Sequence, residues 1–390
     1  MTIKASSQYN YKVPYLPELY NTINSDTTTR IATKIILTST AIFALSCLSL
    51  TPTITLFASC ALGTTVGYIA LKTFAMCCTC VISFVSSQEQ MMKVAQENKK
   101  AFKLPHINSN KRKVPVIHYQ KKHSNNYMVC FHGNAAHVSQ MICNDHLLET
   151  GFQKPFCDHY IASSPPEPNF FDIITGKFNE QTIIDSCVAT LRYMGDFHRQ
   201  KQDEPTPLNL TLVGQSMGGA VALAGLRKLS IQQPDLVKSW NVTVICDRTF
   251  KRYSNLAPDI LKITDFFSVI KSLLKHLVRF VGVDYDNEDI VNQFNNLSNK
   301  PFASLSIQSY TTKFEKDGNT FHDTVITEKH CLKTKKNKYS LENRISNPRN
   351  CDYYFRKYSR EVFGTCLHNM DGCYVLRYLG AEEKQKVKKQ

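Results

Sequence analysis

The segment Thr211–Ala220, TLVGQSMGGA, constrains the fold more than any other part of the chain. An apolar, β-prone run precedes it (Leu208–Val213), and a helix-prone run rich in alanine and leucine follows it (Met217–Leu229). A Gly-x-Ser-x-Gly pattern between a strand and a helix lifts the serine hydroxyl out of the chain on a bend that only small neighbours permit. We therefore predict a strand–turn–helix unit with Ser216 as a candidate nucleophile. A glycine-rich packing turn and an inactive relic of such a site are the alternatives.

A second glycine-containing motif, FHGNAAH (Phe131–His137), follows another apolar run well upstream of the serine. Acyl transfer needs backbone N–H donors aimed at the oxyanion that develops in the reaction. In a sheet hydrolase one donor is the residue after the nucleophile, here Met217, and the other lies in a loop after an earlier strand. Asn134 or Ala135 would supply that second donor. We expect His132 to brace the loop and not to act as a base.

These two motifs, followed by DRTF at Asp247–Phe250, resemble the α/β-hydrolases, particularly the membrane-tethered serine hydrolases with an HGN oxyanion loop. The nearest resemblance is to the chlamydial family known as the CHLPS 43 kDa protein family, and the chain is also similar to lipase-like effectors of intracellular bacteria. The resemblance covers about Val114 to Tyr374. It implies an α/β-hydrolase fold, a Ser-His-Asp triad and no cofactor. Asp247 ends a strand and is expected to be structural.

The remaining triad members should follow in the order serine, acid, histidine. His368 lies in the loop FGTCLHNMDG, which is similar to the family's histidine loop; His322 and His330 are the other downstream candidates. The acid comes from the segment FEKDGNTFHDTVI. Asp323 heads DTVI, which resembles the family's turn after the acid, with threonine where proline is usual. The alternatives are Asp317 and Glu315, because the interval from Asp323 to His368 is longer than the family norm.

Strands and helices are predicted to alternate along the catalytic part. Apolar runs predict an edge strand, a buried strand and two later strands, and helical spacing of apolar residues predicts a helix. Strands separated by helices imply a mostly parallel sheet with helices on both faces. The segment at about 256–298 is apolar at helical spacing and is predicted to form a helical lid, a core helix or a membrane-surface helix. The predicted ranges are 114–120, 126–131, 241–247 and 300–312 for the strands and 179–200 for the helix.

A long uncharged region lies near the N-terminus. No charged residue occurs from Ile35 to Leu71, and after Lys72 the uncharged run continues from Thr73 to Gln88. Since one membrane-spanning helix needs about 20 apolar residues, this region can supply two. We predict a membrane hairpin with both ends cytosolic, because basic residues flank each end. A helical hairpin buried in a soluble fold is the alternative, and the length of the region argues against a signal peptide.

Charge and cysteine content restrict the partners. The chain has 47 basic and 32 acidic residues and a net charge of +15, with the lysines in several short runs. Beside a membrane segment such runs favour anionic headgroups, and no aromatic-interleaved motif points to nucleic acid. The 14 cysteines are scattered, which favours a reducing compartment, and no Cys or His pair recurs at metal-ligand spacing. Cys77, Cys78 and Cys80 are either acylation sites or small apolar residues of a spanning helix.

The sequence thus predicts a membrane-anchored serine hydrolase that cleaves acyl esters or thioesters of a lipid or an acylated protein. The alternative is a non-enzymatic membrane protein that uses a hydrolase-like domain to bind partners, since fold does not imply activity. The resemblance of the hydrophobic region to inclusion-membrane proteins of intracellular bacteria adds the inclusion membrane as a possible location. The expected domains are a leader (1–34), a membrane hairpin (35–88), a linker (89–113), the hydrolase domain (114–380) and a basic tail (381–390).

Overall fold

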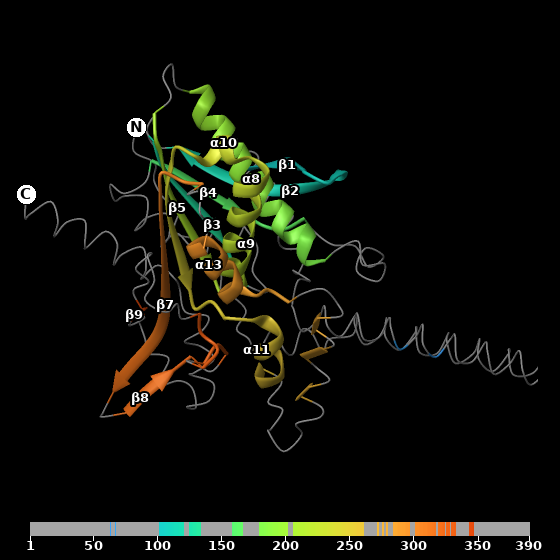
Figure 1. The fold of residues 1–390 in the computed structure, drawn as a ribbon, viewed down its shortest axis with the longest axis vertical. Coiled ribbons are helices and arrows are strands. Elements are labelled where there is room, and N and C mark those ends of the chain that lie inside the picture. The colour runs from blue at the N-terminus through green and yellow to red at the C-terminus, as the bar shows by residue number, and fades with distance from the viewer. Residues whose placement is uncertain are drawn as a thin grey trace, which may run out of the picture. The chain divides into compact units, whose positions relative to one another are not determined.

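The chain divides into two compact units, Met1–Phe74 and Ala75–Gln390. Of the first unit the computed structural model describes Gly63 and Gly67, both helical. Everything below concerns the second unit (Figure 1). Its described residues are 101–120, 125–133, 158–166, 179–201, 206–260, 271–272, 275–276, 278–279, 284–296, 301–316, 319–323, 325–327, 329–332 and 343–346.

Nine described strands form one sheet in the order β1-β2-β4-β3-β5-β6-β7-β8, with β9 paired to β7. Strands β4, β3, β5, β6 and β7 are parallel, whereas β2 is antiparallel to both β1 and β4, and β8 is antiparallel to β7. The strands are β1 (Ala101–His106), β2 (Ser109–Gln120), β3 (Asn126–Phe131), β4 (His159–Ser163), β5 (Leu208–Gln215), β6 (Trp240–Asp247), β7 (Ser304–Lys316), β8 (Asn319–His322) and β9 (Asn343–Ser346).

The strand order reverses in the middle of the sheet. From β3 the chain moves to β4 on one side, and from β4 it returns past β3 to β5 on the other side. The loops that leave β3 and β5 therefore diverge at the carboxyl edge of the sheet. In open α/β sheets this topological switch point is where ligands bind. The two sequence motifs, FHGN and GQSMGG, follow these two strands.

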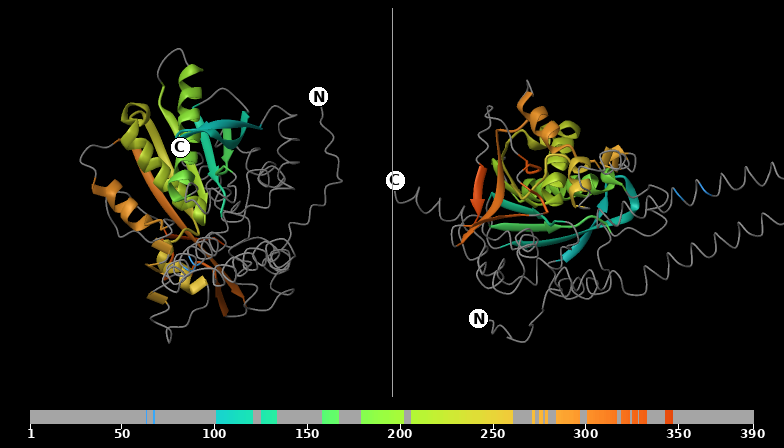
Figure 2. Two further views of the ribbon diagram at one scale, coloured as in Figure 1. Left: turned by 90° about the vertical axis from the view of Figure 1, so that its right-hand side faces the viewer. Right: turned by 90° about the horizontal axis from the view of Figure 1, so that it is seen from below.

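Helices cover one face of the sheet, and α9 lies at the centre of this layer (Figure 2). Helices α8, α10 and α13 each contact α9, which itself contacts β3, β5 and β6. The core between these layers comes from alternate strand residues such as Leu208, Leu210 and Leu212, all buried. Val213, Ile245 and Tyr310 form a smaller cluster on the opposite face. The described helices are α8 (Glu180–Gln200), α9 (Met217–Gln232), α10 (Pro234–Val237), α11 (Tyr253–Ile260) and α13 (Asn287–Asn296).

Most of the predicted elements are present, and the sheet is mixed with a parallel centre. The prediction of an edge strand at 114–120 is wrong, because that segment belongs to β2, which lies between β1 and β4. Residues 101–113, expected in the linker, form β1 and the start of β2. Strand β4 was not predicted at all. It is a run of only five residues, HYIAS, too short to show a period.

Apart from residues 284–286, the predicted lid segment is helical where it is described, and its last part is a core helix. Val291 and Phe294 of α13 are buried, and α13 packs on α9. A helix docked in this way covers the helical layer and not the carboxyl edge of the sheet.

No helix among the described residues is long and apolar enough to cross a membrane. The hydrophobic region 35–88 lies outside the described residues apart from Gly63 and Gly67, as do Cys77, Cys78 and Cys80. The membrane hairpin therefore stays a prediction.

Candidate active site

Ser216 occupies the sharp turn between β5 and α9. It lies at the N-cap of α9 with φ 52° and ψ −116°, a backbone conformation that L-residues rarely adopt. Its side chain makes no capping bond to the helix, and its N–H donates to the carbonyl of Asp247 at 2.8 Å. Strain of this kind is of order 1–3 kcal/mol and is concentrated at functional sites. This geometry is the strand–turn–helix unit expected from the sequence.

Glycines let the turn pack against its surroundings. A Cβ on Gly214 would overlap backbone atoms of Gly218 and Gly219, and a Cβ on Gly218 would overlap the carbonyl oxygens of Phe131 and His132. Because backbone atoms cannot move aside like a flexible side chain, both positions require glycine. The first turn of α9 is thereby pressed against the end of β3.

The end of β3 brings the second motif beside the serine. A Cβ on Gly133 would lie 3.3 Å from the carbonyl oxygen of Gln215 and 3.4 Å from the Cβ of Ser216. His132 braces this loop as expected. Its Nδ1 lies 2.7 Å from the carbonyl oxygen of Gly133, and its Nε2 lies 2.5 Å from Oγ of Ser164 at the end of β4.

Burial lowers the pKa of His132 below its ordinary value, although the bond to the Gly133 carbonyl opposes that shift. A neutral imidazole follows, with one N–H and one lone pair. Since a carbonyl oxygen only accepts, Nδ1 carries the hydrogen and Nε2 accepts from the Ser164 hydroxyl. Both ring nitrogens are engaged in this way, which suits a bracing residue and not a general base.

Asp247 and Arg248 form a buried ion pair at the end of β6, next to the turn of Ser216. The guanidinium of Arg248 donates to both carboxylate oxygens of Asp247, at 3.0 Å and 2.5 Å. Both side chains are about 3% exposed, and Arg248 also has a positive φ of 50°. The carboxylate is thus occupied by a bidentate partner, so Asp247 is unsuited to orienting a histidine. Its structural role was expected, but its partner is its own neighbour in sequence.

Asp323 lies at the same edge of the sheet as Ser216. Gln215, Asp247 and Tyr310 are in register across β5, β6 and β7, and Asp323 follows β8, which turns back along the end of β7. The carboxylate is 4% exposed, and its Oδ1 accepts the backbone N–H groups of Val325 at 2.8 Å and Ile326 at 3.0 Å. These bonds fix the carboxylate in one orientation, which a residue that positions an imidazole needs.

Of the competing histidines, His330 is engaged elsewhere. Its Nε2 lies 2.5 Å from Oδ2 of Asp259, a carboxylate of α11 that also pairs with Lys271 at 2.7 Å and Lys329 at 3.6 Å. This network ties the segment after Asp323 to α11. His330 is therefore a poor candidate for the base.

The remaining candidates are not tested by the structure. His368, Asn134, Ala135 and Asp317 lie outside the described residues, and only the backbone is described for Glu315 and His322. Met217 begins α9 directly after the serine, where its N–H can serve as an oxyanion donor. In the part of the chain that the structure describes, no group of three or more metal-binding side chains occurs.

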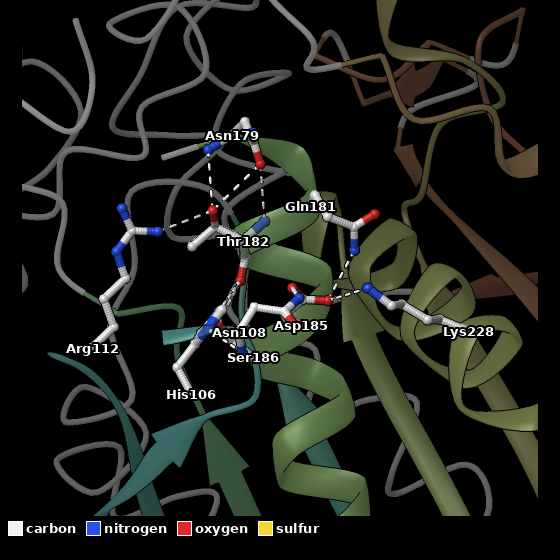
Figure 3. Close-up of polar contacts among 9 residues, drawn as sticks. All are labelled: His106, Asn108, Arg112, Asn179, Gln181, Thr182, Asp185, Ser186 and Lys228. Carbon is white, nitrogen blue, oxygen red and sulfur yellow. Dashed lines mark hydrogen bonds and ion pairs between the residues drawn. The ribbon is translucent and has the colours of Figure 1, made fainter. Parts of the chain in front are cut away.

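A second dense polar cluster surrounds Asp185 of α8, on the helical layer (Figure 3). The carboxylate is 2% exposed and receives Asn108 Nδ2, Gln181 Nε2 and Lys228 Nζ. Nearby, His106 and Arg112 bond to the carbonyl and hydroxyl oxygens of Thr182. The cluster therefore connects the β1–β2 hairpin to α8 and α9. Arg112 belongs to a basic run that we assigned to lipid headgroups, yet its guanidinium bonds within the fold.

Comparison with known proteins finds no matching family profile and no matching curated sequence. Among solved structures the chain is similar to an esterase of Pyrobaculum calidifontis, with 12% identity and a TM-score of 0.40 over 72% of this chain and 90% of that one. A bacterial heroin esterase is similar with 9% identity and a TM-score of 0.41, over 75% and 94% of the two chains. At these values the likeness carries no argument about activity, and the case for the site rests on its own geometry.

The sequence did not reveal Ser164 and Arg248 as residues of this site. Ser164 follows the unpredicted strand β4, and the prolines after it (Pro165 and Pro166) were the available signal that a strand ends there. Arg248 belongs to the DRTF segment, but its positive φ and its bond to Asp247 cannot be read from residue type.

Proposed function

We propose that the chain is a serine ester hydrolase with an α/β-hydrolase fold. The observation that carries this proposal is the meeting of two loops at the switch point of the sheet. There the strained turn of Ser216 lies beside Gly133, in the loop after β3, where an added Cβ would lie 3.4 Å from the Cβ of Ser216. A nucleophile on such a turn, beside a glycine loop that can donate backbone N–H groups, is the arrangement that acyl transfer requires.

In the proposed mechanism His368 takes the proton of the Ser216 hydroxyl as the oxygen attacks an ester or thioester carbonyl. The N–H of Met217 and that of Asn134 or Ala135 hold the oxyanion. Asp323 fixes the tautomer of His368 and stabilises its cation. His368 then protonates the leaving group, and a water activated by the same histidine releases the acyl group. No cofactor enters any step.

The hydrophobic region and the net charge of the chain bear on the class of substrate. A hydrophobic region long enough for two spans, together with a net charge of +15, supports an acyl substrate at an anionic membrane surface. We therefore propose a lipid or an acylated protein as substrate and a membrane location with both chain ends cytosolic. Alkaline carbonate extraction and protease protection of each terminus test the location. Release by carbonate, or protection of one terminus only, would contradict it.

A fluorophosphonate probe tests the nucleophile directly, because it labels an activated serine regardless of the natural substrate. We expect labelling of the full-length wild type and none of Ser216→Ala, together with loss of nitrophenyl ester hydrolysis in that variant. Ser230→Ala, which removes a buried hydroxyl far along α9, is the matched control and should be labelled like the wild type. An unlabelled wild type would favour the non-enzymatic alternative.

A further inference from the structure

A hydrogen-bonded chain leads from the end of β4 to the loop beside the candidate nucleophile. Ser164 Oγ lies 2.5 Å from His132 Nε2, and His132 Nδ1 lies 2.7 Å from the Gly133 carbonyl oxygen. Gly133 in turn approaches the Cβ of Ser216. Ser164 is 2% exposed, and its N–H donates to the Pro115 carbonyl of β2 at 3.2 Å. The start of this chain is thus anchored in the sheet.

We propose that Ser164 is a positioning residue for the oxyanion hole, acting through His132. The inference rests on the proposed hydrolase function and names a further residue of that site. The Gly133 carbonyl requires the hydrogen of the neutral ring on Nδ1, so Nε2 is a lone pair. The Ser164 hydroxyl donates to Nε2 and holds the ring in the orientation that binds the carbonyl.

The direction of that carbonyl matters for the proposed oxyanion donor. In a planar trans peptide the C=O and the following N–H point in opposite directions. We therefore expect a Gly133 carbonyl held by His132 on one side to direct the N–H of the next residue to the other side. Without the Ser164 hydroxyl, the lone pair of Nε2 loses its donor, and the ring can turn away from the Gly133 carbonyl. The peptide plane that carries the oxyanion donor would then be free to rotate.

The neighbouring serine provides a matched control. Ser163 is also buried and also hydrogen-bonded, but its hydroxyl accepts from Thr190 of α8 at 2.8 Å. No hydrogen bond described for Ser163 involves His132. Both hydroxyls are buried and hydrogen-bonded, so loss of either should affect stability similarly. Only the Ser164 hydroxyl should affect the reaction.

The test compares kcat and KM for a nitrophenyl ester in the full chain. Ser164→Ala should lower kcat by about 10- to 100-fold with KM within about twofold, since a displaced donor affects the transition state more than substrate binding. Ser164→Thr keeps the hydroxyl and should restore kcat to within about threefold of the wild type. Ser163→Ala should keep the wild-type kcat. Thermal unfolding of all variants shows whether they are folded.

A measurement on the wild type makes the test independent of how well the variants fold. Long-range ¹H–¹⁵N spectra of ¹⁵N-histidine distinguish the two neutral tautomers, and the signals absent from His132→Gln identify His132. We expect the Nδ1–H tautomer at pH 7. An Nε2–H tautomer, or an unchanged kcat in Ser164→Ala beside an inactive Ser216→Ala, would overturn this inference alone. A wild type without hydrolysis that depends on Ser216 would overturn the proposed function and this inference with it.

Discussion

Two buried polar clusters of the same domain differ in their backbone conformation. Around Ser216, at the carboxyl edge of the sheet, the chain adopts positive φ angles at Ser216 and Arg248, the two non-glycine residues with such angles in the described part of the chain. Around Asp185, on the helical layer, all of the residues sit in regular helix, strand or turn geometry, and the carboxylate receives three donors (Figure 3).

This difference separates a candidate functional site from a structural one. The Asp185 cluster satisfies a buried charge within an unstrained backbone, which is what stability requires. At the carboxyl edge, hydrogen bonds of the sheet hold a strained backbone in place. Backbone strain that does not add to stability points to a functional role. The comparison predicts that changes at the carboxyl edge alter catalysis and that changes at Asp185 alter stability.

The largest expected effect is at the acid of the proposed triad. Asp323→Asn keeps an oxygen that can accept the N–H groups of Val325 and Ile326, so the turn should persist. The lost charge no longer stabilises the histidine cation, and kcat should fall by up to ~10⁴-fold with little change in stability. Asp317→Asn and Glu315→Gln should each lower kcat less than tenfold. A deep loss at Asp317 with a near-normal Asp323→Asn would move the acid to the earlier turn.

The opposite pattern is expected at the structural cluster. Asp185→Ala leaves the ammonium of Lys228 and the amides of Asn108 and Gln181 without their acceptor, and the free energy of unfolding should fall by about 3 kcal/mol. The kcat per folded molecule should stay within about threefold. Denaturant unfolding and active-site titration measure the two quantities. The double variant Asp185→Leu/Lys228→Met should recover part of the stability. A large loss of kcat in Asp185→Ala would contradict a purely structural role of this cluster.

A third polar group, around His118 and away from the candidate site, predicts how stability depends on pH. His118 of β2 contacts Tyr193 and His159, and burial together with the charge of His159 lowers the pKa of His118 from 6.5 to about 4. As pH falls below 6.5 the unfolded chain binds a proton that the folded chain does not, so stability is full above 6.5 and declines toward 4. Between pH 7 and 4.5 this effect should lower the free energy of unfolding by about 2 kcal/mol. Over the same interval, the free energy of unfolding of His118→Gln should fall by about 2 kcal/mol less than that of the wild type, as measured by denaturant unfolding. An equal fall in the two proteins would contradict this account.

The smallest expected effect concerns the strain itself. Ser216→Gly places a residue that tolerates φ 52° in the turn, and the free energy of unfolding should rise by about 1 kcal/mol while hydrolysis is lost. Ser186→Gly is the matched control, because Ser186 lies within α8, where glycine is unfavourable by about 0.5–1 kcal/mol. A rise in the free energy of unfolding for Ser216→Gly and a fall for Ser186→Gly would support the comparison. A destabilised Ser216→Gly would show that the turn stores no relievable strain.

The sequence predicted the local unit around Ser216 better than it predicted the sheet. A strand, a glycine-flanked serine and a helix are encoded within about 20 neighbouring residues by β-branched, small and helix-forming side chains. The switch point between β3 and β5 depends on which strands pair, and long-range pairing leaves no local pattern. Strand β4 shows the difficulty, because His159–Ser163 is short and its buried histidine and serine conceal the apolar pattern.

The site was predictable to the extent that it rests on motifs. Gly133 and Ser216 were identified from their motifs, and the structure brings the two residues together. The hydrogen bonds of His132 to Ser164 and of Arg248 to Asp247 depend on where neighbouring strands end, so residue type alone could not give them. His368 and the oxyanion donors after Gly133 stay predictions.

Strand β1 has a consequence for how the protein behaves at high concentration. Among the described residues β1 is the first strand of the sheet, and its outer edge pairs with no described strand. An edge of this kind is a surface on which another chain could pair and begin to aggregate. Lys103 and Pro105 are exposed on this strand. The lysine opposes the approach of a second positively charged copy, and the proline lacks one of the donors that such pairing needs. We therefore expect these two residues to disfavour pairing between copies of the domain.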